Sequence, residues 1–126
     1  FFRSVKPICT VLFKHRVPKQ LVIQVTDECN ATCPQCNMRK TNNFRRTNLR
    51  DDDVKRILDT AQAAGVEVVS FTGGEPLLYP DKIVSYINYA QQCGIRFIRT
   101  GTNGYIFRIT DNELKWKDRI KKMPIC

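Results

Sequence analysis

The chain has 126 residues, of which 42% are hydrophobic and 26% charged, and its formal net charge is +9. This length supports one domain with a modest core, and the composition is typical of a soluble globular protein. No apolar run approaches the roughly 20 residues that cross a bilayer, so we expect no membrane span. Because the opening Phe1-Phe2-Arg3 has neither an initiator Met nor a signal-peptide pattern, we interpret it as a cut or processed end, or as part of a partial reading frame.

The first 50 residues contain one strand pattern and one cluster of cysteines. We expect residues 1–20 to form an N-terminal extension and residues 21–126 to form a single partial domain. The stretch from Leu21 to Val25 is short and β-branched, which predicts a buried strand. The run Cys29-Asn30-Ala31-Thr32-Cys33-Pro34-Gln35-Cys36 follows, and a polar stretch continues to Arg50. Loops this long in compact domains are usually functional or mobile.

Three of the six cysteines lie in that run, with the spacing C-x3-C-x2-C. Clustered cysteines in a chain that alternates strands and helices bind metal more often than they form disulfides. This usage predicts a reducing, cytoplasmic location. The remaining Cys9, Cys93 and Cys126 are scattered, and we expect them to be packing or surface thiols.

Two helices and two more strands follow in alternation. Asp51-Asp52-Asp53 opens a helix, where carboxylates complement the N-terminal dipole and can cap free amides, and Gly65 is placed to end it. The patterns predict a second strand from Val66 to Phe71, a second helix from Asp81 to Gln92 and a third strand from Ile95 to Thr100. The apolar positions expected to face the core are Val54, Ile57, Leu58 and Ala61 in the first helix and Ile83, Val84, Ile87 and Ala90 in the second.

The order is therefore strand–helix repeated about three times, with a third, basic helix predicted from Thr110 to Lys122. This order predicts an α/β fold with a parallel sheet and right-handed crossovers. Three motifs each follow a strand directly: the cysteine run, Thr72-Gly73-Gly74-Glu75-Pro76 and Thr102-Asn103-Gly104. Because ligands bind at the C-terminal edge of parallel sheets, we expect the three motifs to form one site.

These residue types suit an iron–sulfur cluster that carries a small ligand. Three thiolates hold three irons of a cubane cluster and leave the fourth iron open to an amine and a carboxylate. Gly73 and Gly74 lack a Cβ, so their backbone can approach a ligand closely. Glu75 adds a negative charge that either pairs with an ammonium group or braces the loop. The Asn103 amide can both donate and accept hydrogen bonds.

The three motifs resemble those of the radical S-adenosylmethionine (radical SAM) enzyme family. The resemblance covers about residues 20–105 and implies the N-terminal half of a partial (β/α) barrel, with about three β/α units present. It implies that Cys29, Cys33 and Cys36 bind a [4Fe-4S] cluster and that S-adenosylmethionine (SAM) chelates the open iron. Family members cleave SAM reductively to methionine and a 5′-deoxyadenosyl radical, which abstracts hydrogen from a substrate.

The resemblance also implies SAM contacts and partners. The segment Gly73-Gly74-Glu75 would receive the methionyl amino group, and Thr102 and Asn103 would line the cosubstrate or substrate side of the pocket. Gln35 stands where the family commonly has an aromatic residue, and its backbone would meet the adenine. The implied electron donor is an acidic flavodoxin or ferredoxin, which the positive net charge would attract. The implied activity is that of a peptide maturase or a cofactor-biosynthesis enzyme.

Two other interpretations are open on the residues alone. The clustered cysteines could belong to a structural zinc or iron–sulfur binding module without catalysis. Zinc would take Cys9 or His15 as its fourth ligand, but C-x3-C-x2-C fits the paired knuckles of zinc sites poorly. The basic residues between Arg39 and Arg50 are compatible with a nucleic-acid partner. A solvated basic loop is the commoner explanation of such a stretch, so a nucleic acid is not favoured.

Overall fold

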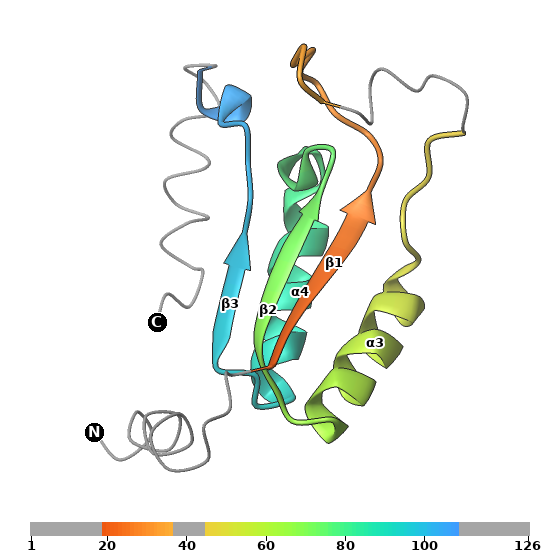
Figure 1. The fold of residues 1–126 in the computed structure, drawn as a ribbon, viewed down its shortest axis with the longest axis vertical. Coiled ribbons are helices and arrows are strands. Elements are labelled where there is room, and N and C mark those ends of the chain that lie inside the picture. Colours follow the sequence, from red (N-terminus) through yellow and green to blue (C-terminus); the bar gives the residue numbers. More distant parts are fainter. Residues whose placement is uncertain (1–18, 37–44, 109–126) are drawn as a thin grey trace.

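The computed structural model describes residues 19–36 and 45–108. The three strands form one parallel sheet in the order β1-β2-β3, and the helices connect them (Figure 1). The predicted α/β fold with parallel strands is confirmed. The elements in chain order are β1 (Lys19–Thr26), α3 (Asp51–Ala63), β2 (Val66–Gly73), the 3-10 turn η1 (Pro76–Leu78), α4 (Pro80–Gln92), β3 (Phe97–Thr100) and the 3-10 turn η2 (Tyr105–Arg108).

Some predictions concern residues outside the described ranges. They include the N-terminal extension up to residue 18, the helix expected from Thr110, and the two candidate fourth zinc ligands, Cys9 and His15. These stay predictions.

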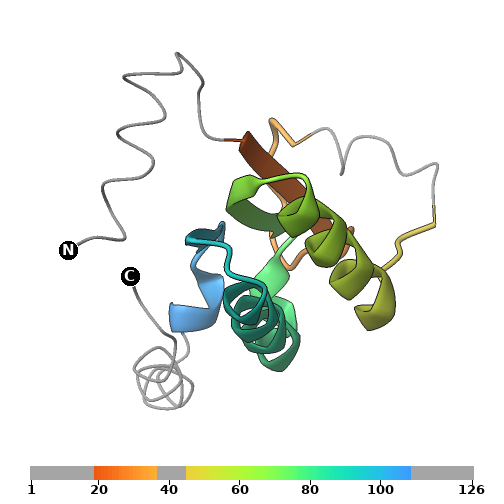
Figure 2. The same cartoon turned by 90° about the horizontal axis from the view of Figure 1, so that it is seen from below.

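Both helices pack against the same face of the sheet (Figure 2). Along β1, Ile23 and Val25 are buried while Val22 is 56% exposed, because alternate side chains of a strand point to opposite faces. Ile23 pairs with Phe71 of β2 in the parallel register, so apolar side chains of neighbouring strands lie together on the helix side. Val54 of α3 is fully buried and belongs to the same core. This layer holds the strand ends, and the loops that follow them, in fixed relative positions.

Helix α3 buries the predicted stripe but begins differently from the prediction. Leu58 is fully buried. Ile57 is half-buried, because it lies at the edge of the apolar stripe. The three aspartates lie in the first turn, yet the N-cap residue is Arg50 and no side chain caps the helix by a hydrogen bond. The carboxylates therefore complement the helix dipole without capping a free amide. Gly65 ends the helix at φ 75°, a left-handed conformation that favours glycine.

Helix α4 turns a tyrosine to the core in addition to the predicted aliphatic residues. Tyr86 is 3% exposed, and its ring lies 5.9 Å from that of Phe71 between ring centroids. Its hydroxyl reaches out of the core and donates a 2.6 Å hydrogen bond to Asp51 of α3. Val84, which was predicted to be buried, is only half-buried. A tyrosine can occupy an inner position because its polar end finds a partner at the edge of the core.

The strands differ from their predicted bounds by a few residues. Strand β1 begins at Lys19, inside the stretch expected to be an extension, and β2 continues to Gly73. Strand β3 begins at Phe97 rather than at Ile95. Ile95 is buried in the connection, where its backbone N–H donates to the carbonyl of Ala90 at 3.0 Å. Ile95 is therefore apolar because it is buried in this turn, and not because it belongs to β3.

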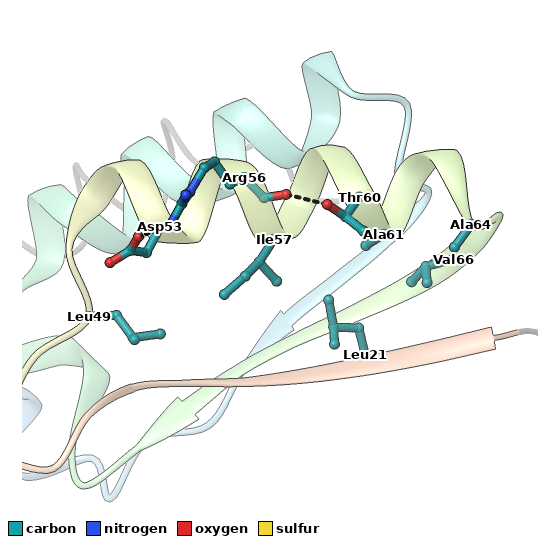
Figure 3. A pocket seen from close by; sticks show the side chains of 9 residues that line it. All are labelled: Leu21, Leu49, Asp53, Arg56, Ile57, Thr60, Ala61, Ala64 and Val66. Carbon is teal, nitrogen blue, oxygen red and sulfur yellow. Dashed lines mark hydrogen bonds and ion pairs between the residues drawn. The ribbon is translucent and has the colours of Figure 1, made fainter.

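A hollow of about 640 Å³ lies between α3 and β1, away from the three motifs. Leu21 of β1 and Ile57 of α3 face each other across it, Leu49 lies at one end and Val66 at the other (Figure 3). Within the described ranges, no helix is long and apolar enough to cross a membrane.

Candidate functional site

The loops that follow the three strands meet at one edge of the sheet (Figure 1). The backbone N–H of Gly74 donates to the carbonyl of Thr26 at 2.8 Å, and the N–H of Glu75 donates to the carbonyl of Glu28 at 2.7 Å. These bonds continue the β1–β2 pairing into the loops. Gly101 N–H likewise donates to the carbonyl of Phe71 at 3.1 Å. The expectation that the motifs share one edge is confirmed by this geometry.

The three clustered cysteines line one pocket of about 500 Å³. Gly73 and Gly74 form part of its wall, so the cysteine run and the glycine motif face the same space. The backbone N–H of Cys36 donates to the carbonyl of Cys33 at 3.1 Å. This turn closes over Pro34 and Gln35, and the cysteines on both sides of it line the same pocket.

The two glycines are required by close backbone packing rather than by an open approach path. A Cβ at Gly73, whose φ is 150°, would overlap the carbonyl oxygen of Thr26. A Cβ at Gly74 would overlap the carbonyl of Glu28 and lie 3.0 Å from the Cβ of Cys29. Their lack of a side chain therefore lets the loop after β2 press directly against the start of the cysteine loop.

Glu75 is 1% exposed and braces the loops. Its Oε1 accepts from the backbone N–H of Leu77 at 2.9 Å, and its Oε2 accepts from the N–H of Asn103 at 2.6 Å. Of the two roles that the sequence leaves open for this carboxylate, the bracing role is the one seen in its contacts. The buried charge is stabilised by these two amide donors.

Asn103 lies in the loop after β3, and its side chain contacts the cysteine loop. Its Nδ2 donates to Oδ1 of Asn30 at 2.8 Å and lies 3.7 Å from Sγ of Cys29. Thr102 is exposed and accepts a 3.0 Å hydrogen bond from the N–H of Gly104 through its hydroxyl. Asn103 is thus joined to the cysteine loop, whereas Thr102 stabilises its own turn.

Gln35, expected to meet the adenine through its backbone, is exposed in the turn between the last two clustered cysteines. Neither Gln35, Glu75, Thr102 nor Asn103 is among the residues that line the pocket itself. The cysteines and glycines of the motifs therefore line the pocket, whereas Glu75 and Asn103 support it from outside.

Sequence reasoning missed a polar cluster beneath the cysteine loop. The Tyr79 hydroxyl donates to Oε2 of Glu28 at 2.5 Å, and Nδ2 of Asn48 lies 3.2 Å from Oε1 of the same carboxylate. Glu28 also lines the pocket. In the sequence, only the position of Glu28 directly before the first clustered cysteine indicates a role at the site. No spacing rule pairs Glu28 with Tyr79, which is 51 residues away.

Arg46 is a second residue that sequence reasoning missed, because the basic stretch was interpreted as solvated. It is half-buried, lines the pocket, and donates from Nη1 to the carbonyl of Asp27 at 2.7 Å. Burial works to raise the pKa of the Asp27 carboxyl, but hydrogen bonds from Gln24 and Thr47 and the nearby Arg46 outweigh it and lower that pKa. The base of the loop is thereby held by an ionised aspartate.

The donor set fits a cluster of several irons. Among residues 19–36 and 45–108, no three His, Cys, Asp or Glu side chains converge as the ligands of a single metal ion do. In a cubane cluster each thiolate binds a different iron, so three sulfurs around one pocket are the required arrangement. The larger hollow between α3 and β1 has mainly apolar walls and no cysteine.

The fold and this site define an α/β protein with a cysteine-lined pocket at the C-terminal edge of a parallel sheet. The profile of the radical SAM superfamily matches residues 23–124 of the chain. The chain therefore belongs to the radical SAM superfamily, and the predicted family resemblance is confirmed.

Curated relatives are enzymes of this family. GTP 3′,8-cyclase of Clostridium botulinum is 31% identical over 119 residues, which cover 91% of this chain and 37% of that protein. AdoMet-dependent heme synthase of Methanosarcina barkeri is 29% identical over 87 residues, which cover 69% of this chain and 24% of that protein. The chain thus spans between a quarter and somewhat more than a third of the length of these relatives.

Two solved structures show the same fold at low sequence identity. HydG, a maturase of the [FeFe]-hydrogenase, has a TM-score of 0.61 and 18% identity, with 94% of this chain and 27% of that chain covered. Methylornithine synthase has a TM-score of 0.53 and 18% identity, with 94% of this chain and 46% of that chain covered. Both similarities support the partial (β/α) barrel that the resemblance implied.

Proposed function

We propose that this chain is the N-terminal part of a radical SAM core that binds a [4Fe-4S] cluster through Cys29, Cys33 and Cys36. The observation that carries this proposal is the shared pocket, in which all three cysteines lie beside Gly73 and Gly74. These cysteines would hold the cluster, which when bound would supply the electron for reductive cleavage of SAM and so the radical chemistry of hydrogen abstraction from the substrate. The protein contributes placement, charge and exclusion of water.

The residues around the pocket have separate tasks in this proposal. The backbone of Gly73 and Gly74 forms part of the pocket wall beside the cysteine loop and would receive the methionyl amino group of SAM. Glu75 holds that wall in place through its two amide donors. Thr102 and Gln35 lie outside the pocket lining, so their SAM contacts depend on backbone groups or on chain segments beyond those described.

For the substrate, cofactor biosynthesis is favoured over peptide maturation. The relatives that cover most of this chain include enzymes named for a reaction of GTP and for the synthesis of heme. Both names denote chemistry on small molecules. The similarity to a hydrogenase maturase is a similarity of fold and supports no particular substrate.

The electron donor in this proposal is an acidic flavodoxin or ferredoxin in a reducing cytoplasm. The formal net charge of +9 supports electrostatic attraction of such a partner. The cysteines of the loop must stay reduced to bind iron, which requires a compartment that does not oxidise them. No nucleic-acid partner is needed to account for the positive charge.

Anaerobic reconstitution with iron and sulfide tests the proposal. We expect brown protein with about four irons per chain, and an EPR spectrum of the reduced cluster that changes when SAM is added. Replacing Cys93, which lies away from the pocket, should leave the iron content unchanged. A colourless protein with one zinc per chain, or a cluster whose spectrum ignores SAM, would overturn the assignment.

A further inference from the structure

Of the three clustered cysteines, Cys29 has a distinct environment. Its sulfur accepts from the backbone N–H of Ala31 at 3.4 Å and lies 3.7 Å from Nδ2 of Asn103. Both distances are within the usual range for N–H···S hydrogen bonds. One donor belongs to the cysteine loop itself, whereas the other comes from the loop after β3, 74 residues along the chain.

The orientation of the Asn103 amide is fixed by its other contacts. Its Oδ1 accepts a 3.0 Å hydrogen bond from the backbone N–H of Tyr105, which can only donate. The NH2 end must therefore face the cysteine loop, where Oδ1 of Asn30 accepts from it at 2.8 Å. The second proton of this NH2 group is the one directed at Cys29. The alternative placement of oxygen and nitrogen would set Oδ1 of Asn103 against the thiolate and lose the bond from Tyr105.

The backbone of Asn103 is held independently of its side chain. Its N–H donates to Oε2 of the buried Glu75 at 2.6 Å, and the N–H of Glu75 donates to the carbonyl of Glu28. Cys29 follows Glu28 directly, so the chain of contacts returns to the cysteine loop. These contacts hold the backbone of Asn103 beside the cysteine loop, with its side-chain Nδ2 3.7 Å from Sγ of Cys29.

We propose that Asn103 is a positioning residue whose side-chain N–H donates to the Cys29 thiolate and thereby raises the reduction potential of the cluster. The inference rests on the proposed function, because it needs Cys29 to be a cluster ligand. Hydrogen bonds to ligand sulfurs stabilise negative charge, and the reduced cluster carries one more negative charge than the oxidised one. A donor at this sulfur therefore favours the reduced state.

The test is an EPR-monitored redox titration of the reconstituted full-length protein, with Asn103→Asp as the main variant. Aspartate keeps the acceptor for Tyr105 but removes the N–H and adds a negative charge near the sulfur. We expect the equilibrium to shift against reduction by about tenfold, which is 59 mV for a one-electron couple. Asn103→Ala removes the donor without adding charge, so its shift should have the same sign and be smaller.

Asn48→Ala is the matched control. Its amide also supports the cysteine loop, through Glu28 and Tyr79, but it has no hydrogen bond to a sulfur within residues 19–36 and 45–108. We expect its potential to equal that of the wild type. An unchanged potential in Asn103→Asp, or an equal shift in Asn48→Ala, would overturn the inference.

Loss of the cluster has a distinct meaning in this experiment. If both Asn103 variants lose iron while Asn48→Ala keeps it, Asn103 holds the loop rather than tuning the potential, and the inference fails. If the wild type itself binds no cluster, the proposed function fails first. The two failures are therefore distinguishable.

Discussion

The carboxylate of Glu75 accepts a 2.6 Å hydrogen bond from the backbone N–H of Asn103 and joins the loops after β2 and β3. The same carboxylate also accepts from Leu77, so both of its oxygens have partners while the side chain is 1% exposed. A buried charge in this position stabilises the site only if both amides stay aligned with it. Glu75 therefore links the geometry of the pocket wall to the stability of the domain.

Replacing Glu75 by Gln should lower the free energy of unfolding by about 2 kcal/mol, because an amide nitrogen replaces one of two charged acceptors. Urea unfolding followed by circular dichroism measures the change. The matched control is Glu67→Gln, since Oε2 of Glu67 is buried without a hydrogen-bond partner among the described residues. We expect that control not to lower the stability, because it removes charge from a buried oxygen that has no hydrogen bond to lose. Equal effects of the two substitutions would contradict the bracing role of Glu75.

Replacing Gly74 by Ala should reduce iron retention, because the new Cβ would overlap the carbonyl of Glu28 and displace the start of the cysteine loop. Overpacking of this kind costs about 1–3 kcal/mol. The iron content per chain after anaerobic reconstitution and desalting measures the effect.

Gly101→Ala provides the control for this substitution. A Cβ at Gly101 meets no atom within 4 Å, and its N–H can still donate to Phe71. The control should retain iron as the wild type does. If Gly74→Ala retains as much iron as Gly101→Ala, the contact between the two loops has no role in holding the cluster.

Much of the fold could be predicted because hydrophobic periodicity determines it. The strand and helix order follows from apolar patterns, and the motifs then fall at one edge because parallel strands all point the same way. The clustered cysteines were identifiable because their spacing is rare outside metal sites. Strand ends were less predictable. Ile95 is apolar because it is buried in the turn before β3, and the sequence alone cannot distinguish this from burial in the strand.

The supporting contacts of the site could not be predicted from the sequence. A glutamate after two glycines is equally suited to a ligand and to a brace, and only the positions of Leu77 and Asn103 decide between them. The pairing of Glu28 with Tyr79 depends on where the end of η1 places the tyrosine, which is 51 residues away along the chain. Arg46 was hidden among basic residues whose composition indicates a solvated loop, although its own contacts hold it against the pocket.

Replacing Cys33 by Ala should abolish cluster retention and any cleavage of SAM, because a cubane cluster held by two protein thiolates loses an iron ligand. Iron analysis and chromatographic detection of 5′-deoxyadenosine measure the two losses. Cys93→Ala is the control, since this thiol lies near Asp59, to which its Sγ is hydrogen-bonded at 3.5 Å, and not at the pocket. Full cluster content in Cys33→Ala would contradict the assignment of the ligands.

The contact between α3 and α4 should make the stability of the domain depend on pH. The hydrogen bond from Tyr86 lowers the pKa of Asp51. Burial opposes this effect, and the nearby Lys82 adds to the lowering, so that the pKa lies below its ordinary value. Burial raises the pKa of Tyr86, and its bond to Asp51 raises it further. A carboxyl with a lowered folded-state pKa stabilises the protein above its unfolded-state pKa, and this contribution is lost as the pH falls through the folded-state pKa. A tyrosine with a raised pKa contributes below its unfolded-state pKa of about 10 and loses that contribution as the pH rises further.

Tyr86→Phe tests this dependence because it removes the hydroxyl and keeps the ring against Phe71. At neutral pH we expect the variant to be less stable by about 1 kcal/mol. The difference from the wild type should begin to shrink as the pH falls below about 4, the unfolded-state pKa of an aspartate. It should be lost as the pH falls through the lower folded-state pKa of Asp51. Asp51→Asn should narrow the same difference at neutral pH, and the double variant measures the coupling of the pair. A difference between wild type and Tyr86→Phe that stays constant from neutral to acidic pH would show that the ionised state of Asp51 does not stabilise the packing of the two helices.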